Sequence, residues 1–314
     1  MGKFPFEEIN REILIKRKSE DKPDYQRHIK ELLDYGVINI DKPKGPTSHQ
    51  VADFVQKILK ISKSGHSGTL DPQVTGSLVV AVSKATRIVQ ALLTAGKEYV
   101  CLMHIHKEID EKKIKKTLKD FTGKITQLPP VKSAILRVER ERNIYYIDLL
   151  EIDGQDVLFR IGCQAGTYIR KICHDMGRAL GTGAHMAELR RTRVGPFDES
   201  TLVTLNDLAD AFWYYENGND KFISKLIQPV ENAVKHLPMI WVLGNTVSTL
   251  SHGADLKVPG IAKLHSNIQK DDIVAVMGLD KRLLALGDAK MTSEEMMEKD
   301  KGLAVTINKV FINQ

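Results

Sequence analysis

The chain has 314 residues, of which 42% are hydrophobic and 27% charged, and its formal net charge is +6. No apolar run approaches the ~20 residues that a membrane-spanning helix needs, and the charged beginning leads us to expect no secretory signal. Three cysteines without a CxxC pair predict buried thiols in a reducing compartment, not a disulfide framework or a zinc site. The positive charge favours a polyanionic partner, and the length suits one large domain with one small one.

The first third of the chain begins with an extension. Residues 1–34 alternate acids and bases with scattered apolar positions, which predicts a segment that docks onto another part of the molecule. A short strand is expected over 36–41. Thr47 and Gln50 then have the spacing of a capping box before an apolar stripe over 51–59, which predicts a helix.

An irregular loop follows that helix. Residues 62–77 lack periodicity and hold three glycines and one proline, which predicts a shaped loop before an apolar strand at 78–82. Further helices are expected over 88–93, 112–121, 167–180 and 204–216, β structure over 97–106 and 137–164, and an extended segment over 125–136. Beyond Pro238, strand-like segments at 239–243, 273–277, 283–286 and 303–307 predict a small β-rich domain.

Common catalytic motifs are missing from the sequence. It has no Walker loop, no HExxH motif, no complete GxGxxG and no Gly-x-Ser-x-Gly elbow. What remains is Asp71, at the centre of the glycine-rich loop. An aspartate before proline is kept out of helical geometry and could be presented into a cleft. From these residues alone, a turn or capping aspartate is the simpler interpretation, and His66 has a structural or surface role by default.

Four segments resemble the ordered motifs of the TruB family of pseudouridine synthases: GVINIDKPKGPTS (36–48), GHSGTLDPQVTG (65–76), KEYV (97–100) and GTYIRKICHDMGRALGTGAHMAELRRTRVG (166–195). KEYVCLMHIH and GAHMAELRRTRVGPF resemble more narrowly the archaeal relatives of dyskerin, the catalytic subunit of H/ACA guide-RNA particles. LSHGADLKVPGIAKLH (250–265) and LALGDAKM (284–291) resemble a PUA domain, an RNA-binding module. The resemblance covers nearly the whole chain.

The resemblance implies an α+β fold. We expect a pseudouridine synthase fold, which is a mixed and largely antiparallel sheet flanked by helices, followed by a small β-rich PUA domain. The extension over 1–34 should pack on the PUA domain, the catalytic domain should span 35–236, and the PUA domain should span 237–314. The absence of a Lys-rich tail favours an archaeal-type cytoplasmic protein over a nucleolar one.

The resemblance also implies a reaction, the isomerisation of uridine to pseudouridine, for which we expect no metal and no organic cofactor. The C1′–N1 bond is broken and the link is remade at C5, so one ionised carboxylate, here Asp71, can serve as nucleophile or base. Arg170 is expected to pair with and position Asp71, the alternative being a surface or phosphate-binding arginine. Tyr99 is expected to stack on the uracil and could supply a hydroxyl, the alternative being a core tyrosine.

The resemblance implies that further residues contact RNA. His66 would help to hold the flipped nucleotide, Leu189 would line the pocket floor or belong to the core, and Lys42 would buttress the site or meet a phosphate. Three arginines are spaced to meet backbone phosphates, the alternative for one or two of them being a simply solvated side chain: Arg190, Arg191 and Arg193. The PUA face expected to lie against RNA comprises Gly253, Ala254, Asp255, Pro259 and Gly260, unless these glycines only form β-turns.

We therefore hypothesise the catalytic subunit of an RNA-guided pseudouridine synthase acting on rRNA, with tRNA as a further substrate. The expected partners are an H/ACA guide RNA, the substrate RNA and three small proteins: a Nop-type protein, a Gar-type β-barrel protein and a kink-turn-binding ribosomal-like protein. No membrane partner is expected. One alternative is a stand-alone tRNA pseudouridine synthase of the same fold, and another is a catalytically silent RNA scaffold.

Overall fold

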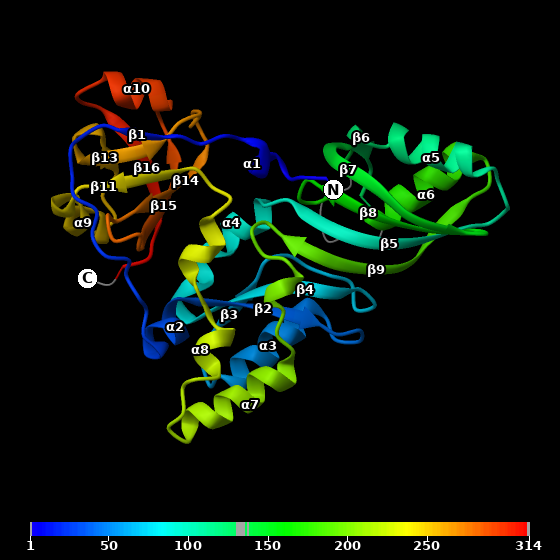
Figure 1. Cartoon of the computed structure of the whole chain (residues 1–314), viewed down its shortest axis with the longest axis horizontal. Helices are drawn as coiled ribbons and strands as arrows, with labels where there is room; N and C mark the ends of the chain where they lie inside the picture. Colours follow the sequence, from blue (N-terminus) through cyan, green and yellow to red (C-terminus); the bar gives the residue numbers. More distant parts are fainter. Residues whose placement is uncertain (1, 130–135, 137, 313–314) are drawn as a thin grey trace.

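The computed structural model describes residues 2–129, 136 and 138–312, so the predicted extended segment lies outside them from Pro130 to Ile135. Two sheets organise the molecule (Figure 1). The larger runs in the order β10 (Gln228–Pro229), β2 (Gly36–Lys42), β4 (Thr75–Val82), β9 (Ala184–Val194), β5 (Lys97–Ile105), β8 (Asp156–Cys163), β7 (Arg140–Asp153), β6 (Gly123–Gln127), and β3 (Ser64–His66) pairs with β4. Its pairings are antiparallel except for the parallel contact between β4 and β9, which confirms the predicted mixed, largely antiparallel sheet.

Helix α3 (Ser48–Ile58) begins as the sequence predicts. The Thr47 hydroxyl accepts a hydrogen bond from the Gln50 amide at 3.1 Å, and the Gln50 side chain accepts one from the Thr47 amide at 2.8 Å. This capping box satisfies two amides that the first helical turn leaves unpaired. Val51 and Val55 are fully buried against β2 and β4. The helix therefore covers the sheet directly beside the start of the irregular loop.

The far half of the sheet is covered by α5 (Glu111–Asp120) and α6 (Ile169–Leu180), which share an apolar core with β5 and β8 (Figure 1). Helix α6 starts later than predicted, because the Thr167 hydroxyl donates to the Gln164 carbonyl and does not cap the helix. Arg170 is thus its second residue. The other helical elements between residues 83 and 234 are η1 (Ser83–Ile88), α4 (Val89–Thr94), η2 (Glu199–Thr201), α7 (Leu205–Glu216), α8 (Ile223–Leu226) and η3 (Val230–Val234).

The C-terminal part forms the second sheet with a core of its own. The sheet runs in the order β1 (Ile13–Ile15), β13 (Ile261–His265), β11 (Met239–Val242), β14 (Ile273–Met277), β15 (Leu283–Ala289), β16 (Leu303–Val310), β12 (Leu256–Lys257), with α9 (Gly244–Ser251), η4 (Val258–Gly260) and α10 (Ser293–Glu298) around it. The strands predicted after Pro238 are present, whereas α9 and α10 were not predicted. Both helices are short, so they add little periodic signal to the sequence.

The N-terminal extension contacts both parts of the molecule. Strand β1 pairs antiparallel with β13, and the Arg17 guanidinium donates to the carbonyls of Val258 and Ile261 at 2.9 and 3.0 Å. Hydrogen bonds between Asn10 and Asn267 and between Tyr25 and Asp280 extend this contact with the C-terminal domain on both sides. The beginning of the chain and α2 (Ile29–Tyr35) contact the large sheet instead. In Figure 1 the chain crosses from β1 through α1 (Pro5–Glu8) to the large sheet, and α2 also packs there.

Phe4 explains why the beginning of the chain departs from that expectation. It is fully buried, with its ring 6.0 Å from that of Tyr145 and 6.2 Å from that of Tyr146. Two glycines leave room for this aromatic cluster, since a Cβ on Gly162 would lie 2.3 Å from the Tyr146 ring and one on Gly96 3.2 Å from that of Tyr145. The expectation that residues 1–34 pack on the PUA domain is therefore wrong at both ends.

Two exclusions concern the described part of the chain. Each of its helices is too short or too polar to span a bilayer. Its His, Cys, Asp and Glu side chains form no group of three or more that could hold a metal ion. Cys101, Cys163 and Cys173 are free and buried, as predicted for small core residues.

Candidate active site

The irregular loop between β3 and β4 presents Asp71 beside helix α6. The Arg170 guanidinium donates to the Asp71 carboxylate, so the ion pair implied by the sequence is present. Both side chains remain open to solvent, with exposed fractions of 58% for Arg170 and 53% for Asp71. A carboxylate held by an arginine yet accessible from solvent can meet a substrate. The assignment of Asp71 as the reacting group stays a prediction.

Lys42 supports the loop that carries Asp71 from the protein interior. Its side chain is fully buried, and its ammonium donates to the carbonyls of Pro43 at 2.9 Å, Pro72 at 3.2 Å and Val74 at 2.9 Å. An ammonium has three donors, so all are used. Burial, and secondarily the Arg191 charge, lower the pKa of Lys42. Of its two expected roles, buttressing is the one seen; its burial excludes a phosphate contact in this conformation.

Ser48 holds the other side of the same loop, and sequence reasoning did not single it out. Its hydroxyl accepts from the Leu70 amide at 2.7 Å and donates to the Leu70 carbonyl at 3.2 Å. The Gly45 amide donates to the Pro72 carbonyl at 2.9 Å. The loop is thus fixed immediately before and after Asp71. The one available signal was the position of Ser48 at the end of the first matching motif.

Arg191 is buried beside the Asp71 loop, opposite Tyr99 on the neighbouring strand. It is 1% exposed and donates to the carbonyls of Ser77 at 2.7 Å and Gly68 at 3.3 Å, and on the sheet it is the cross-strand partner of Tyr99. Arg191 therefore does not face RNA phosphates as the sequence led us to expect, because its side chain points into the core. Tyr99 is 9% exposed; burial raises its pKa and the Arg191 charge opposes that rise.

The other two arginines of this strand region are held by carboxylates. Arg190 forms a fork with Asp41 at 3.0 and 3.1 Å and also donates to Glu199 at 2.7 Å. Arg193 pairs with Glu7 at 2.6 Å and lies over the Phe4 ring. Both arginines are therefore paired with carboxylates in this structure, and contacts of either residue with RNA phosphates remain predictions.

His66 lies at the end of β3, where the chain turns toward Asp71, and Leu189 lies on β9. The His66 ring is half-buried and accepts from the Gly68 amide at 3.3 Å. Burial and then the Arg191 charge lower its pKa, so the ring is neutral at pH 7. Leu189 is half-buried and packs against the core shared with β5, where its partner is Cys101. Contacts of either residue with a nucleotide remain predictions.

The expected RNA face of the C-terminal domain lies after α9. Ala254, Asp255 and Pro259 are exposed, and the Asp255 carboxylate accepts from the Ile307 amide at 2.8 Å. Gly253 has a φ of +80°, which favours glycine, and a Cβ on Gly260 would lie 2.8 Å from the Thr246 side chain. Backbone conformation explains the glycine at 253 and close packing explains the one at 260, and contacts of either residue with RNA remain a prediction.

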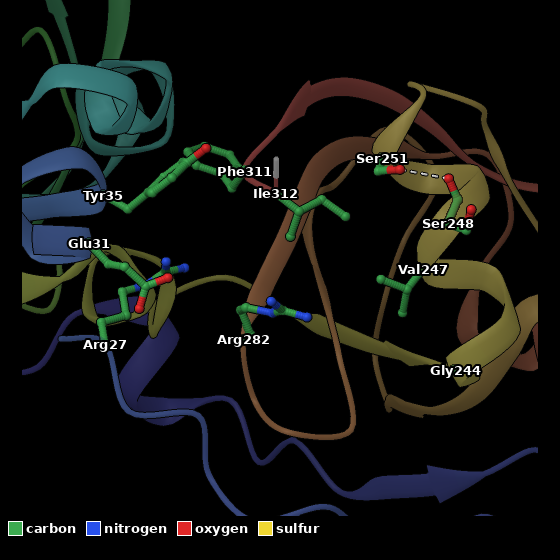
Figure 2. Close-up of a pocket in the computed structure, with 10 residues that line it drawn as sticks. All are labelled: Arg27, Glu31, Tyr35, Gly244, Val247, Ser248, Ser251, Arg282, Phe311 and Ile312. Atoms are coloured by element: carbon green, nitrogen blue, oxygen red, sulfur yellow. Dashed lines mark hydrogen bonds between the residues drawn. The ribbon is translucent and has the colours of Figure 1, made fainter. Parts of the chain in front are cut away.

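A cavity of about 470 Å³ lies elsewhere, between the extension and the C-terminal domain (Figure 2). Arg27 and Tyr35 line one side, and Val247, Arg282 and Phe311 line the other. No residue of the Asp71 loop or of α6 contributes to its lining. The cavity is therefore separate from the candidate active site.

Family models match consecutive parts of the chain. The TruB family pseudouridylate synthase N-terminal domain matches residues 56–169, and the tRNA pseudouridylate synthase B C-terminal domain matches 170–235. The PUA domain matches 238–311, and a DKCLD (NUC011) domain matches 11–52. Asp71 and Tyr99 fall in the first of these ranges, and Arg170 opens the second.

Individual proteins resemble the chain over nearly its whole length. A probable tRNA pseudouridine synthase B of Pyrococcus furiosus is 55% identical over 97% of this chain and 92% of its own, and that of Methanopyrus kandleri is 49% identical over 99% and 93%. Among solved structures, a chain of a Cbf5-Nop10-Gar1 complex matches with a TM-score of 0.95 at 54% identity, covering 98% of this chain and 96% of that one. A chain of an H/ACA RNP bound to a substrate RNA containing 2′-deoxyuridine matches with a TM-score of 0.92 at 52% identity, covering 99% of this chain and 97% of that one.

This protein therefore belongs to the TruB family of pseudouridine synthases, enzymes that isomerise uridine in RNA, and carries a PUA domain.

Proposed function

We propose that this protein is the catalytic subunit of an H/ACA guide-RNA particle that converts chosen uridines of rRNA to pseudouridine, with tRNA as a further substrate. The observation that carries the proposal is the solvent-open Asp71–Arg170 pair on a loop fixed from two sides. The likeness to chains solved within a Cbf5-Nop10-Gar1 complex and a substrate-bound H/ACA RNP supports the particle.

In this proposal the ionised Asp71 acts on an extruded uridine. The C1′–N1 bond breaks, the uracil turns within the site, and a C1′–C5 bond forms; the proton leaves C5 and N1 gains one, so the base is retained and no redox step occurs. Arg170 orients the carboxylate from α6. His66 and Leu189 contact the extruded nucleotide, and Tyr99 contacts the uracil. Flipping a base out of its stack costs a few kcal/mol, less when it is already unpaired.

The partners follow the same proposal. A guide RNA pairs with the substrate RNA and presents the uridine, and the PUA face around Gly253 and Pro259 binds RNA. A Nop-type protein, a Gar-type protein and a kink-turn-binding ribosomal-like protein complete the particle, which we place in an archaeal-type cytoplasm. Similar chains have been solved in a Cbf5-Nop10-Gar1 complex and in an archaeal Nop10-Cbf5 complex, which supports two of these partners.

The test is a map of pseudouridines in RNA treated with the reconstituted particle, comparing the wild type with Asp71→Asn. The substitution removes the charge and keeps the size, so we expect pseudouridine to disappear while RNA affinity and the melting temperature stay unchanged. Persistent activity of Asp71→Asn would overturn the assignment of the reacting group.

A second candidate is a stand-alone tRNA pseudouridine synthase, which the names of the curated relatives favour. Purified protein is assayed on bare tRNA with and without guide RNA and partner proteins. Activity that never responds to guide RNA supports this candidate. RNA binding without pseudouridine formation under every condition would instead indicate a catalytically silent scaffold.

A further inference from the structure

Glu98 is a buried carboxylate that the functions described above do not use. It is 2% exposed, and its two side-chain oxygens accept hydrogen bonds from the Thr192 hydroxyl at 2.6 Å and from the Tyr146 hydroxyl. Burying a carboxylate costs free energy unless hydrogen bonds compensate for its lost hydration. The two hydroxyls supply such bonds from different strands, because Tyr146 lies on β7 and Thr192 on β9, whereas Glu98 lies on β5. These side chains therefore tie three strands of the large sheet together.

A glycine lets Tyr146 reach across to Glu98. Strand β8 lies between β7 and β5 (Figure 1), and Gly162 on β8 pairs with Tyr146 on one side and with Glu98 on the other. The Tyr146 ring lies over this glycine, since a Cβ at position 162 would be 2.3 Å from the ring. A larger residue there would displace the ring, and with it the hydroxyl that Glu98 accepts from.

Thr192 is the extra residue of a β-bulge in β9. Glu98 pairs with Arg193, and the next residue of β5, Tyr99, pairs with Arg191. Thr192 is therefore left without a cross-strand partner of its own. In an unbroken strand, residues two positions apart point to the same face of the sheet, whereas a bulge breaks this alternation and re-aims a side chain. The bond from the Thr192 hydroxyl to Glu98 fixes the bulged residue to the neighbouring strand.

The contacts of the two arginines show the result of the bulge. Arg191 donates to the carbonyls of Gly68, on the loop, and Ser77, just after it. Arg193, two positions later, pairs instead with Glu7 of the N-terminal extension. Their cross-strand partners are successive residues of β5, which point to opposite faces of the sheet. The bulge thus directs one arginine to the loop and the other to the reverse face.

Tyr99 faces the loop because Glu98 faces away from it. Tyr99 belongs to the same apolar cluster as Leu70 and Val74, which lie on either side of Asp71. Glu98, the residue before it on the strand, points to the reverse face, where its two hydroxyl partners are. The direction of the tyrosine and that of the arginine opposite it therefore depend on the same stretch of β5 and β9.

We propose that Glu98 is a positioning residue for pseudouridine formation. With its two hydroxyl partners it fixes the bulge in β9, and the bulge keeps Tyr99 and Arg191 on the face of the sheet that meets the Asp71 loop. The inference rests on the proposed function and deepens it. Glu98 is buried on the reverse face, so it acts only through the residues that it positions.

Two substitutions at Thr192 test this role. Thr192→Val keeps the shape and removes the hydroxyl, whereas Thr192→Ser keeps the hydroxyl and removes a methyl group. For a guide-presented substrate RNA, we expect kcat of the valine variant to fall about tenfold, less than the ~100-fold that a 1 Å misplacement can cost. Its KM should stay within about twofold, the pattern of an interaction needed only in the transition state. The serine variant should retain the wild-type kcat.

Tyr146→Phe removes the other hydrogen bond and should also lower kcat about tenfold. Combined with Thr192→Val, the loss should reach no more than about thirtyfold, and not the ~100-fold product of independent losses, because both hydroxyls act through one carboxylate. Tyr145→Phe is the matched control. The Tyr145 hydroxyl has no hydrogen-bond partner among the described residues, so this variant should keep the wild-type kcat.

Hydrogen exchange of the loop amides over 68–74 gives a readout that does not depend on catalysis. Exchange should be faster than in the wild type for Thr192→Val and Tyr146→Phe, since Arg191 would hold the Gly68 carbonyl less firmly. Thr192→Ser should exchange like the wild type. Rates are measured well below the melting temperature of each variant, so that loss of folded protein does not contribute.

The outcomes are distinct. Unchanged kcat in Thr192→Val, equal losses in the valine and serine variants, or a double loss equal to the product would overturn the positioning role. If Thr192→Val does not fold, Tyr146→Phe, which removes one oxygen only, is compared with Tyr145→Phe, and equal kcat values overturn the role. A wild-type particle that forms no pseudouridine refutes the proposed function instead. Loop exchange then decides the role of Glu98, and unchanged exchange in Tyr146→Phe overturns it.

Discussion

The Arg170 guanidinium holds the Asp71 carboxylate although the two residues are 99 positions apart in the sequence. Both side chains are more than half exposed, and exposed ion pairs contribute only about 0–1 kcal/mol to stability. The pair is therefore poorly explained as a stabilising contact. Its position, on a loop fixed by Lys42 and Ser48, is better explained by the need to orient a carboxylate toward a substrate.

Arg170→Met should separate activity from stability. We expect the free energy of unfolding to change by less than about 1 kcal/mol, because the lost pair is exposed. Pseudouridine formation should fall about 100-fold, since the carboxylate loses its orientation. Both are measured on the same preparation, by thermal melting and by pseudouridine mapping. Lys171→Met, which removes the neighbouring pair with Asp175, is the matched control and should stay active. Equal activity of the two variants would contradict the orienting role.

Lys42→Met should destabilise the protein and disorder the Asp71 loop. The buried carbonyls of Pro43, Pro72 and Val74 would lose their donor, and each unsatisfied buried group costs about 1–3 kcal/mol. Thermal melting and hydrogen exchange of the loop amides measure the two effects. Lys44→Met removes an exposed lysine from the same segment and should leave both unchanged. Wild-type stability in Lys42→Met would refute the buttressing role.

Phe4→Ala should detach the beginning of the chain from the large sheet. Removing a fully buried phenylalanine typically costs about 3–5 kcal/mol, which chemical denaturation can measure. Limited proteolysis should then cut before β1, while the pairing of β1 with β13 persists. The half-buried Phe6 offers a comparison, and Phe6→Ala should cost less. A loss below about 1 kcal/mol for Phe4→Ala would mean that this docking contributes little.

Acid should weaken the protein through a buried histidine. Burial lowers the pKa of His236 to about 4, and this ring donates to the Ala91 carbonyl while its other nitrogen is buried without a partner. As the pH falls below about 6.5, the unfolded chain takes up a proton that the folded protein excludes. The free energy of unfolding therefore falls between pH 6.5 and 4, by on the order of 3 kcal/mol from this group.

His236→Phe should flatten that dependence, because the substituted ring cannot bind a proton. Denaturation curves at several pH values from 7 to 4 give the slope for each protein. His265, whose pKa burial also lowers to about 4, contributes a slope that remains in the variant. An unchanged slope in His236→Phe would show that the ring is already protonated in the folded protein or is accessible to water.

Local patterns predicted the regular elements well. The capping box at Thr47 and Gln50, the buried strand β4 and the glycine at which α6 ends depend on neighbours in sequence, and all are present. The match of motifs also predicted the Asp71–Arg170 pair. Thr167 was wrong as a cap: its hydroxyl donates to the Gln164 carbonyl and does not accept from an amide of the first helical turn, and helix-start patterns do not distinguish these two local bonds.

The sequence by itself determined the family, the two folded parts and the identity of the candidate reacting group, because motifs and periodicity are local properties. Only the tertiary structure decided which charges are free. Arg190, Arg191 and Arg193 look alike in the sequence, yet two meet carboxylates and one is buried with its guanidinium bonded to backbone carbonyls. The direction of a strand side chain and the nearest counter-charge depend on residues brought together by folding, and no spacing along the chain encodes them.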